Sequence, residues 1–175
     1  MKRYTAFTFD LPALRVIENE HHLLRYMMDQ WHPIVLNFER NVYSVAEGHK
    51  ALLDLRSKLA HFKGVLVKHF QKEEKYLFSK LVQYVGDEQG PVVAVEEEHE
   101  EINAYIEHFF HHTEGDLVHL SLQQMKEIVQ DAGEAFEIIT FHFIKEESVI
   151  FPMVEEILKP NEQYALFENL YSSII

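Results

Sequence analysis

The stretch HFQKEE at residues 69–74 returns as HFIKEE at residues 142–147, in the second half of the chain. A Glu-His pair precedes each copy, at residues 20–21 in the first half and at residues 98–99 in the second. Each half therefore offers one isolated histidine and one histidine followed four residues later by a glutamate. A repeat of this kind indicates a single two-sided site to which both halves contribute.

Apolar residues around these stretches recur at alternating spacings of three and four, which is typical of helices with one buried stripe. We predict an all-α fold, an up-down-up-down four-helix bundle over residues about 11–158, with a short C-terminal helix at about 161–172. Residues 1–10 show no clear period and are interpreted as an arm. The predicted helices run from Leu11-Pro12 to Glu47-Gly48, from about His49 to Tyr84 with Gly86-Asp87 as the stop, from Gly90-Pro91 to Gly115, and from between Asp116 and Ser121 to the break at Lys159-Pro160.

Length and composition set the limits of this fold. The 175 residues are enough for one well-filled core and too few for two ordinary domains, so we predict a single domain over residues 1–175. The apolar share of 47% and the charged share of 26% are those of a globular protein. Because the chain has no cysteine, disulfides and thiolate ligands are excluded, and His, Asp and Glu remain as possible metal ligands.

Charge and hydropathy narrow the classes of partner. The formal net charge of -13 argues against nucleic acids and anionic membranes, because both attract basic surfaces. No apolar run approaches the roughly 18 residues of a membrane span, and the first residues show no apolar signal core. A small neutral or gaseous ligand would be indifferent to this charge, and we expect a cytoplasmic protein.

Six polar residues interrupt the apolar stripes of the predicted helices. Burying an unpaired carboxylate costs several kcal/mol and an unpaired imidazole about 1 to 3, so six such groups would consume the roughly 5 to 15 kcal/mol of a domain's stability. Histidines outnumber glutamates in this set, so bound cations compensate it better than hydrogen bonds within a purely polar core. The predicted metal ligands are His21, His69, Glu73, His99, His142 and Glu146.

The helical rise of about 1.5 Å per residue places all six residues at one level of an up-down bundle. A histidine and a glutamate four apart are stacked neighbours about 6 Å apart, so each pair can reach two adjacent ions. The simplest assembly has Glu73 and Glu146 bridging two metals, with two histidines completing each. Imidazole and carboxylate without sulfur suit iron, with manganese or zinc as alternatives.

Glu18 and Glu96 offer a different interpretation. Each stands three residues before a histidine, His21 or His99, which gives the ExxH spacing of ferritin-type di-iron bundles. This arrangement would leave the two HxxxE histidines unexplained, so we rank it below the first.

Other polar residues near the stripes have structural explanations. His22 lies off the stripe, Glu74 and Glu147 are predicted to point outward or to support the ligands, and Tyr76 is either a core ring or a hydrogen-bond donor to the site. Histidines between the stripes are predicted to be solvated, and those from 108 to 112 could instead bind a surface metal. The solvated set is His32, His49, His61, His108, His111, His112 and His119.

With these residues in view, the chain resembles the hemerythrin-like family of HHE cation-binding domains over residues about 11–158. The resemblance rests on a His in the first and third predicted helices, HxxxE in the second and fourth, and the local phrases HFxxEE and IFP. It implies a di-iron centre bridged by two carboxylates and an oxo or hydroxo group. It also implies a non-haem protein that binds dioxygen reversibly or reacts with oxygen, peroxide or nitric oxide. We expect a protein that binds, senses or reacts with such small oxidants, with iron storage or donation as a further alternative.

Two departures from the family's oxygen carriers stand out. Asn103 occupies the position, four after the third-helix histidine, where the carriers place a further His. The carriers also bridge with an Asp five residues after the fourth-helix histidine, whereas this chain has Glu146 at four and Glu147 at five. With two histidines for each iron, both irons would have an open position. The departures favour sensing, peroxide or nitric oxide chemistry, or iron handling over simple oxygen carriage.

Overall fold

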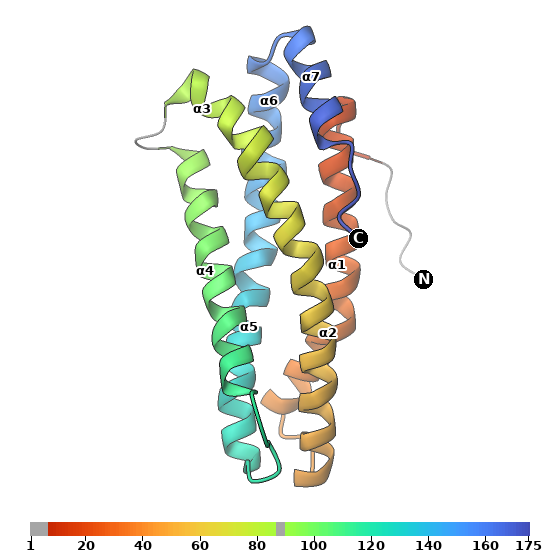
Figure 1. The fold of residues 1–175 in the computed structure, drawn as a ribbon, viewed down its shortest axis with the longest axis vertical. Coiled ribbons are helices and arrows are strands. Elements are labelled where there is room, and N and C mark those ends of the chain that lie inside the picture. The colour runs from red at the N-terminus through yellow and green to blue at the C-terminus, as the bar shows by residue number, and fades with distance from the viewer. Residues whose placement is uncertain (1–6, 87–89) are drawn as a thin grey trace.

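The computed structural model describes residues 7–86 and 90–175, and in this part of the chain four helical runs pass up and down along one axis (Figure 1). The described residues contain no strand, and the predicted all-α bundle with a short C-terminal helix is confirmed. The elements are α1 (Pro12–Glu39), α2 (Val45–Lys72), the π-helical segment η1 (Glu73–Phe78), α3 (Ser79–Val85), α4 (Pro91–His112), α5 (Leu122–Lys145), the π-helical segment η2 (Glu146–Ile150), α6 (Phe151–Ile157) and α7 (Pro160–Leu170).

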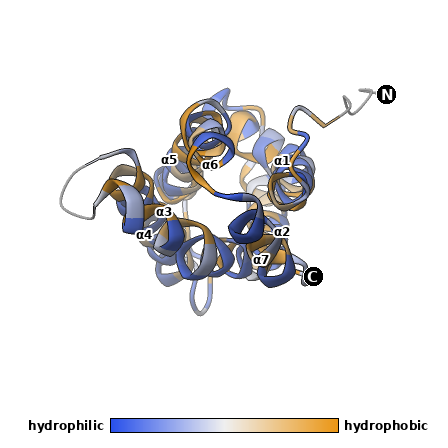
Figure 2. Ribbon diagram, turned by 90° about the horizontal axis from the view of Figure 1, so that it is seen from above, coloured by the Kyte–Doolittle hydropathy of each residue, from blue (hydrophilic) through white to orange (hydrophobic). Residues whose placement is uncertain are grey.

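The helices surround a common interior, which Figure 2 shows from one end. α1 packs against α2 and α5, and α4 packs against the same two helices from the other side. α2, η1 and α3 form one continuous run, as do α5, η2 and α6. α7 folds back over α1 and η1, so the end of the chain covers one side of the bundle. None of the helices among the described residues is long and apolar enough to span a membrane.

Two apolar clusters fill the interior, one on each side of a polar layer that consists of the six predicted metal ligands. The larger cluster includes Trp31, Phe62 and Phe109, all fully buried. The smaller cluster includes Phe78 and Phe151 and is closed by residues of α7. Along each of the four runs, the residues of one cluster give way to those of the other at the predicted metal ligands. The sequence period therefore places these polar residues between two hydrophobic blocks.

The first helix boundary differs from the prediction. α1 ends at Glu39, not at Glu47-Gly48, and α2 begins at Val45. The reason is a capping box at Ser44, whose hydroxyl accepts from the Glu47 amide at 3.4 Å while the Glu47 carboxylate accepts from the Ser44 amide at 2.8 Å. Gly48 lies inside α2, where a Cβ would come within 2.9 Å of the Leu122 side chain. This glycine permits a close helix contact and does not end a helix.

The remaining boundaries lie close to those predicted. α5 begins at Leu122 after the Ser121 capping box with Gln124, within the predicted range. α4 ends at His112, slightly before the predicted stop at Gly115. α3 ends at Val85 before Gly86, while Asp87 of the predicted stop lies outside the described residues, as do residues 1–6 of the predicted arm.

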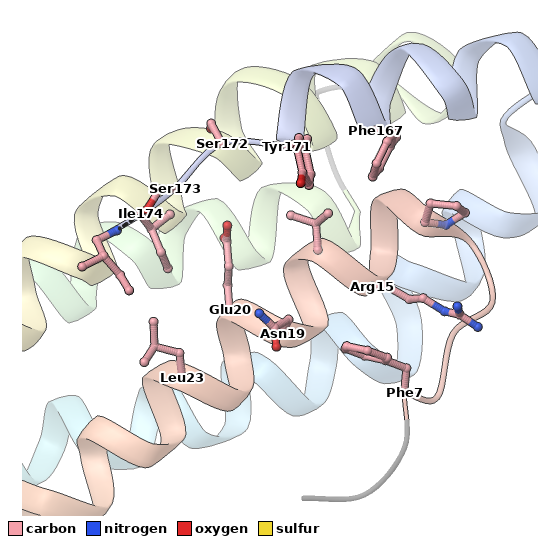
Figure 3. Close-up of a pocket in the computed structure, with 13 residues that line it drawn as sticks. Phe7, Arg15, Asn19, Glu20, Leu23, Phe167, Tyr171, Ser172, Ser173 and Ile174 are labelled. Atoms are coloured by element: carbon pink, nitrogen blue, oxygen red, sulfur yellow. Dashed lines mark hydrogen bonds between the residues drawn. The ribbon is translucent and has the colours of Figure 1, made fainter.

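The C-terminal segment 171–175 continues from α7 along α1 (Figure 3). Ile174 is buried in the larger apolar cluster. Between this segment and α1 lies a groove of about 760 Å³, lined mainly by apolar side chains together with Arg15 and Glu20. The end of the chain therefore forms one wall of a groove that reaches to the edge of the polar layer.

Candidate metal centre

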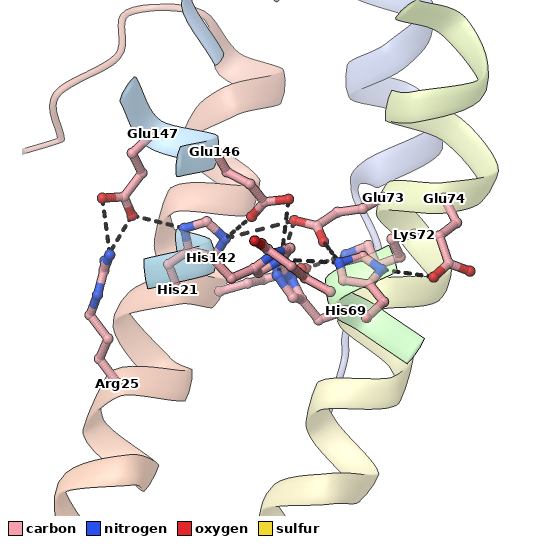
Figure 4. Close-up of polar contacts among 12 residues, drawn as sticks. His21, Arg25, His69, Lys72, Glu73, Glu74, His142, Glu146 and Glu147 are labelled. Atoms are coloured by element: carbon pink, nitrogen blue, oxygen red, sulfur yellow. Dashed lines mark hydrogen bonds and ion pairs between the residues drawn. The ribbon is translucent and has the colours of Figure 1, made fainter. Parts of the chain in front are cut away.

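The six predicted ligands meet at the middle of the polar layer and are fully or almost fully buried (Figure 4). Their donor atoms form two overlapping groups, and within each group all the atoms lie within 4.8 Å of one another. One group contains the His21 and His69 nitrogens, and the other contains those of His99 and His142. Glu73 and Glu146 belong to both groups. The structure therefore brings together every residue of the predicted set, while their role as ligands stays a prediction.

Glu73 divides its two oxygens between the groups. Oε1 lies 3.0 Å from Nε2 of His69 and 3.7 Å from Nε2 of His21. Oε2 lies 3.4 Å from Nε2 of His99, on the other side. This is the placement that a carboxylate bridging two ions requires.

Glu146 repeats the arrangement from the opposite helix. Its Oε2 lies 3.1 Å from Nε2 of His21 and its Oε1 lies 3.5 Å from Nε2 of His142. The Nε2 atoms of His99 and His142 are 3.0 Å apart. Both carboxylates thus face both histidine pairs, as the repeated sequence predicts.

The two π-helical segments begin at these two glutamates, η1 at Glu73 and η2 at Glu146. A π-helical turn accommodates extra backbone, so the buried stripe beyond it moves by one residue. Segments of this kind are frequent at functional sites, and here each starts at a shared carboxylate.

The predicted stripe is consequently wrong beyond both glutamates. Leu77 is buried in place of Tyr76, which is half-buried and packs against the edge of the smaller cluster. Ile150 is buried in place of Val149, which is 42% exposed.

An outer ring of glutamates holds the other nitrogen of every histidine in the centre. Each glutamate directly precedes or follows a predicted ligand on one helical run and contacts a histidine of the next run, so the ring passes from α1 to α2, α4, α5 and back to α1. The Nδ1 to carboxylate distances are 2.9 Å for His69 to Glu20, 2.7 Å for His99 to Glu74, 3.0 Å for His142 to Glu98 and 2.8 Å for His21 to Glu147.

This ring determines which histidine nitrogens face the centre. A carboxylate at Nδ1 accepts a hydrogen bond from the ring N–H, which orients the ring so that Nε2 faces the centre. Sequence reasoning noted Glu74 and Glu147 beside the ligands but assigned no such role to Glu20 and Glu98. The available signal was their position, since each directly precedes an isolated histidine.

Electrostatics show how strongly the centre demands positive charge. Burial by itself lowers the pKa of His69, but Glu73 and Glu20 outweigh it and raise that pKa to about 9. Burial also opposes a charged His21, yet Glu146, Glu147 and Glu73 raise the pKa of His21 well above its usual value. Conversely, burial favours a neutral Glu73, but the neighbouring histidines hold its pKa well below the usual range. Glu73 therefore stays ionised and attracts cations.

The donor set fits a pair of metal ions. Nε2 of His21, Nε2 of His69 and both oxygens of Glu73 and Glu146 are buried without a hydrogen-bond partner, although some lie within ion-pair distance of one another. A buried polar atom left in this state costs about 1–3 kcal/mol. Cations between these atoms would satisfy all of them, and a set of imidazoles and carboxylates suits iron, manganese or zinc.

The structure does not bring the alternative ligands into either group. The Glu18 carboxylate accepts from the backbone amides of Thr8 at 2.7 Å and Phe9 at 3.4 Å, so it holds the entering chain. Burial, followed by the charge of Glu74, raises the pKa of Glu96, which belongs to neither group. The geometry therefore does not support the ExxH arrangement. The Oδ1 atom of Asn103 is buried without a hydrogen-bond partner.

Two of the histidines predicted to be solvated are half-buried. His32 stacks on Phe136 with 3.4 Å between ring centroids, and Nε2 of His49 lies 3.0 Å from the Leu120 carbonyl oxygen. Both pack along helix flanks, which a one-stripe pattern does not represent.

A family model for the hemerythrin HHE cation-binding domain matches residues 12–154. The match covers most of the chain, all six predicted ligands, both π-helical segments and the outer glutamates. Searches of curated proteins and of solved structures gave no significant match.

Proposed function

The chain belongs to the hemerythrin HHE cation-binding family, and on this premise we propose that it is a non-haem protein that holds two iron ions. His21 and His69 would bind one ion, His99 and His142 the other, and Glu73 and Glu146 would bridge them. The main support for this proposal is that each of the two carboxylates directs one oxygen toward each histidine pair.

We propose dioxygen or a related small oxidant such as peroxide or nitric oxide as the ligand. Bound iron supplies the redox chemistry for such molecules. The chain supplies apolar walls: Phe143 stacks on His21 at 4.1 Å between ring centroids, and Phe70 stacks on His99 at 3.6 Å. Stacked rings on both sides leave little room for large substrates and exclude bulk water, which favours a small neutral ligand.

Metal content tests the proposal directly. Protein purified and loaded with iron without oxygen is expected to hold two ions per chain, by metal analysis and optical spectroscopy. Glu73→Gln and Glu146→Gln remove one bridge each and should each lower the iron content. Glu168→Gln, at an exposed position of α7, is the matched control and should keep two ions. One ion or none in the unaltered protein would contradict a dinuclear centre.

Exposure of the reduced, iron-loaded protein to oxygen separates the functions. Asn103 has an amide where the oxygen carriers of the family place an imidazole, which favours sensing, oxidant processing or iron handling over carriage. We expect no spectrum that appears with oxygen and disappears when oxygen is removed. Turnover of peroxide or nitric oxide would identify an enzyme, and iron transfer to an apo-protein would identify a donor.

A further inference from the structure

We infer that the two metal positions differ in the rate at which they exchange their ions with the solvent. The ion between His99 and His142 enters and leaves past Glu74, over the acidic face of α4, while the ion between His21 and His69 is retained. This inference rests on the proposed dinuclear centre and concerns the outer glutamates that support it.

The His69 side of the centre is closed by a buried ion pair. Glu20, which holds His69, pairs with Lys72, and their side chains are only 7% and 8% exposed. Lys72 also donates to the Ser172 carbonyl at 2.7 Å, so the C-terminal segment locks this pair from outside. The groove in Figure 3 reaches Glu20, but a cation entering there would meet the Arg15 side chain, and Glu20 is already paired with Lys72.

The His21 side is held by a two-point contact. Arg25 donates to both oxygens of Glu147, at 2.8 and 3.0 Å, and its guanidinium lies 5.3 Å from the centre of the Phe143 ring. Phe143 in turn stacks on His21. A bidentate contact between arginine and a carboxylate is rigid and specific. The Glu147 carboxylate, which accepts the hydrogen bond from His21, therefore has little freedom to move.

The His99 side lacks this support. Glu74 is 46% exposed and contacts His99 at 2.7 Å, and in the described part of the chain no Lys or Arg lies within ion-pair distance of it. The residue one turn after His99 is Asn103, whereas the residue one turn after His21 is Arg25. The two halves therefore match in their histidines and differ in the cation that fixes the outer glutamate.

The remaining support, for His142, is only partly open to solvent, because Glu98 is 15% exposed, against 28% for Glu147 on the His21 side. Glu98 holds His142 and pairs with Lys145, whose side chain is 52% exposed. Exposed pairs of this kind are screened by water and contribute little rigidity. In this half Glu98 is therefore paired with an exposed cation, and Glu74 has no Lys or Arg within ion-pair distance among the described residues.

The surface outside this half attracts cations. Residues 96–101 read EEEHEE, and the acidic residues among them are exposed or half-buried on α4. Glu74 and Glu96 are close enough for the charge of Glu74 to contribute to a raised pKa of Glu96. A surface of one sign of charge raises the local concentration of oppositely charged ions and speeds their entry. Behind it, Oε2 of Glu73 is buried without a hydrogen-bond partner and faces His99.

Release of metal to a chelator tests the inference. Protein loaded with two Co²⁺ ions is mixed with excess chelator, and release is followed by absorbance and by metal analysis. We expect two phases, each of one ion per chain. Glu74→Gln should speed the fast phase about tenfold, the lower end of the effect of removing an outer partner, and leave the slow phase unchanged. Glu147→Gln should speed only the slow phase.

Exchanging the residues that differ between the halves provides the matched test. Arg25→Asn gives the His21 side the residue found on the His99 side and should bring the slow phase toward the fast one. Asn103→Arg should slow the fast phase by offering Glu74 a partner, and circular dichroism would verify that this variant folds. Equal release of both ions, or acceleration of the slow phase by Glu74→Gln, would overturn the inference. A protein that binds no pair of ions would instead refute the proposed centre.

Discussion

The polar layer and the larger apolar cluster beside it are built by the same four helical runs and are equally buried, yet they contribute to stability in opposite ways. Burial in the apolar cluster is favourable in itself, at about 25 cal/mol for each Å² removed from water. Burial in the layer leaves donor atoms of Glu73 and Glu146 without hydrogen bonds, which is unfavourable until a cation compensates them. From this comparison we expect the cluster to stabilise the chain alone and the layer to do so only when cations occupy it.

The largest expected effect comes from a cavity in the apolar cluster. Phe62 is fully buried, with its ring centroid 5.6 Å from that of Trp31. Phe62→Ala should lower the free energy of unfolding by about 3–5 kcal/mol, in metal-free and metal-loaded protein alike. Urea unfolding measures this, and Leu53→Ala, which truncates a 57% exposed side chain, should change little. A loss confined to the metal-loaded form would contradict the independence of the cluster.

The second effect has the opposite sign. Replacing His21, His69, His99 and His142 by Leu, and Glu73 and Glu146 by Met, exchanges all six buried polar groups of the layer for apolar ones. Because buried charged groups are often less stabilising than well-packed apolar side chains, the metal-free protein should gain about 1–4 kcal/mol. The variant should bind no metal. Urea unfolding and metal analysis measure both results, and a less stable variant would show that the layer stabilises the fold without metal.

Much of this layer could be predicted from the sequence, because a helix of fixed period fixes which residues share a face and a level. His21 and His99 have no HxxxE partner, yet they fall at the level of the two HxxxE pairs. The prediction failed just beyond Glu73 and Glu146, where the π-helical segments shift the stripe. Apolar neighbours such as Leu77 and Phe78 suit either register, so periodicity alone does not reveal the extra residue.

The outer ring could not be predicted for a different reason. Glu20 and Glu98 resemble ordinary surface glutamates in composition, and their role depends on which helix lies beside them. That order is a property of the assembled bundle. Ser44, by contrast, begins a capping box that can be recognised in the sequence. The predicted start of α2 at about His49 is therefore wrong for a reason that the sequence itself reveals.

Metal removal is the third test of the comparison. Each bound ion stabilises the folded state by RT ln(1 + [L]/Kd), which is about 1.4 kcal/mol when free metal is tenfold above Kd. A chelator should therefore lower the melting temperature by about 3 to 6 °C for each ion removed, given a shift of about 2 to 4 °C per kcal/mol at this chain length. Calorimetry measures the shift. The variant with the apolar layer is the control and should not respond, and a response there would place the stabilising ions elsewhere.

The smallest effect compares one residue type in the two environments. In the layer, carboxylates overcome burial and raise the pKa of His69 to about 9. Beside the apolar cluster, His32 stacks on Phe136 and burial lowers its pKa, because the more distant Glu39, Glu137 and Asp29 do not offset the loss of water. Between the lowered value and the ordinary value of 6.5, the unfolded chain binds more protons at His32 than the folded protein does. Above pH 6.5 the lowered pKa of His32 therefore has no effect on the free energy of unfolding. As the pH falls through that interval, it lowers this free energy progressively.

His32→Gln should accordingly remove part of the loss of stability on acidification, measured by urea unfolding at pH 5.5 and 7.5. His119→Gln, at an exposed position on the loop before α5, is the matched control and should leave the pH dependence as it is. An NMR titration of the His32 ring should give a midpoint below that of an unfolded peptide. A midpoint above it would mean that the carboxylates around His32 outweigh its burial. The two environments would then differ only in degree, because a histidine beside the apolar cluster would respond to its charged neighbours as the layer histidines do.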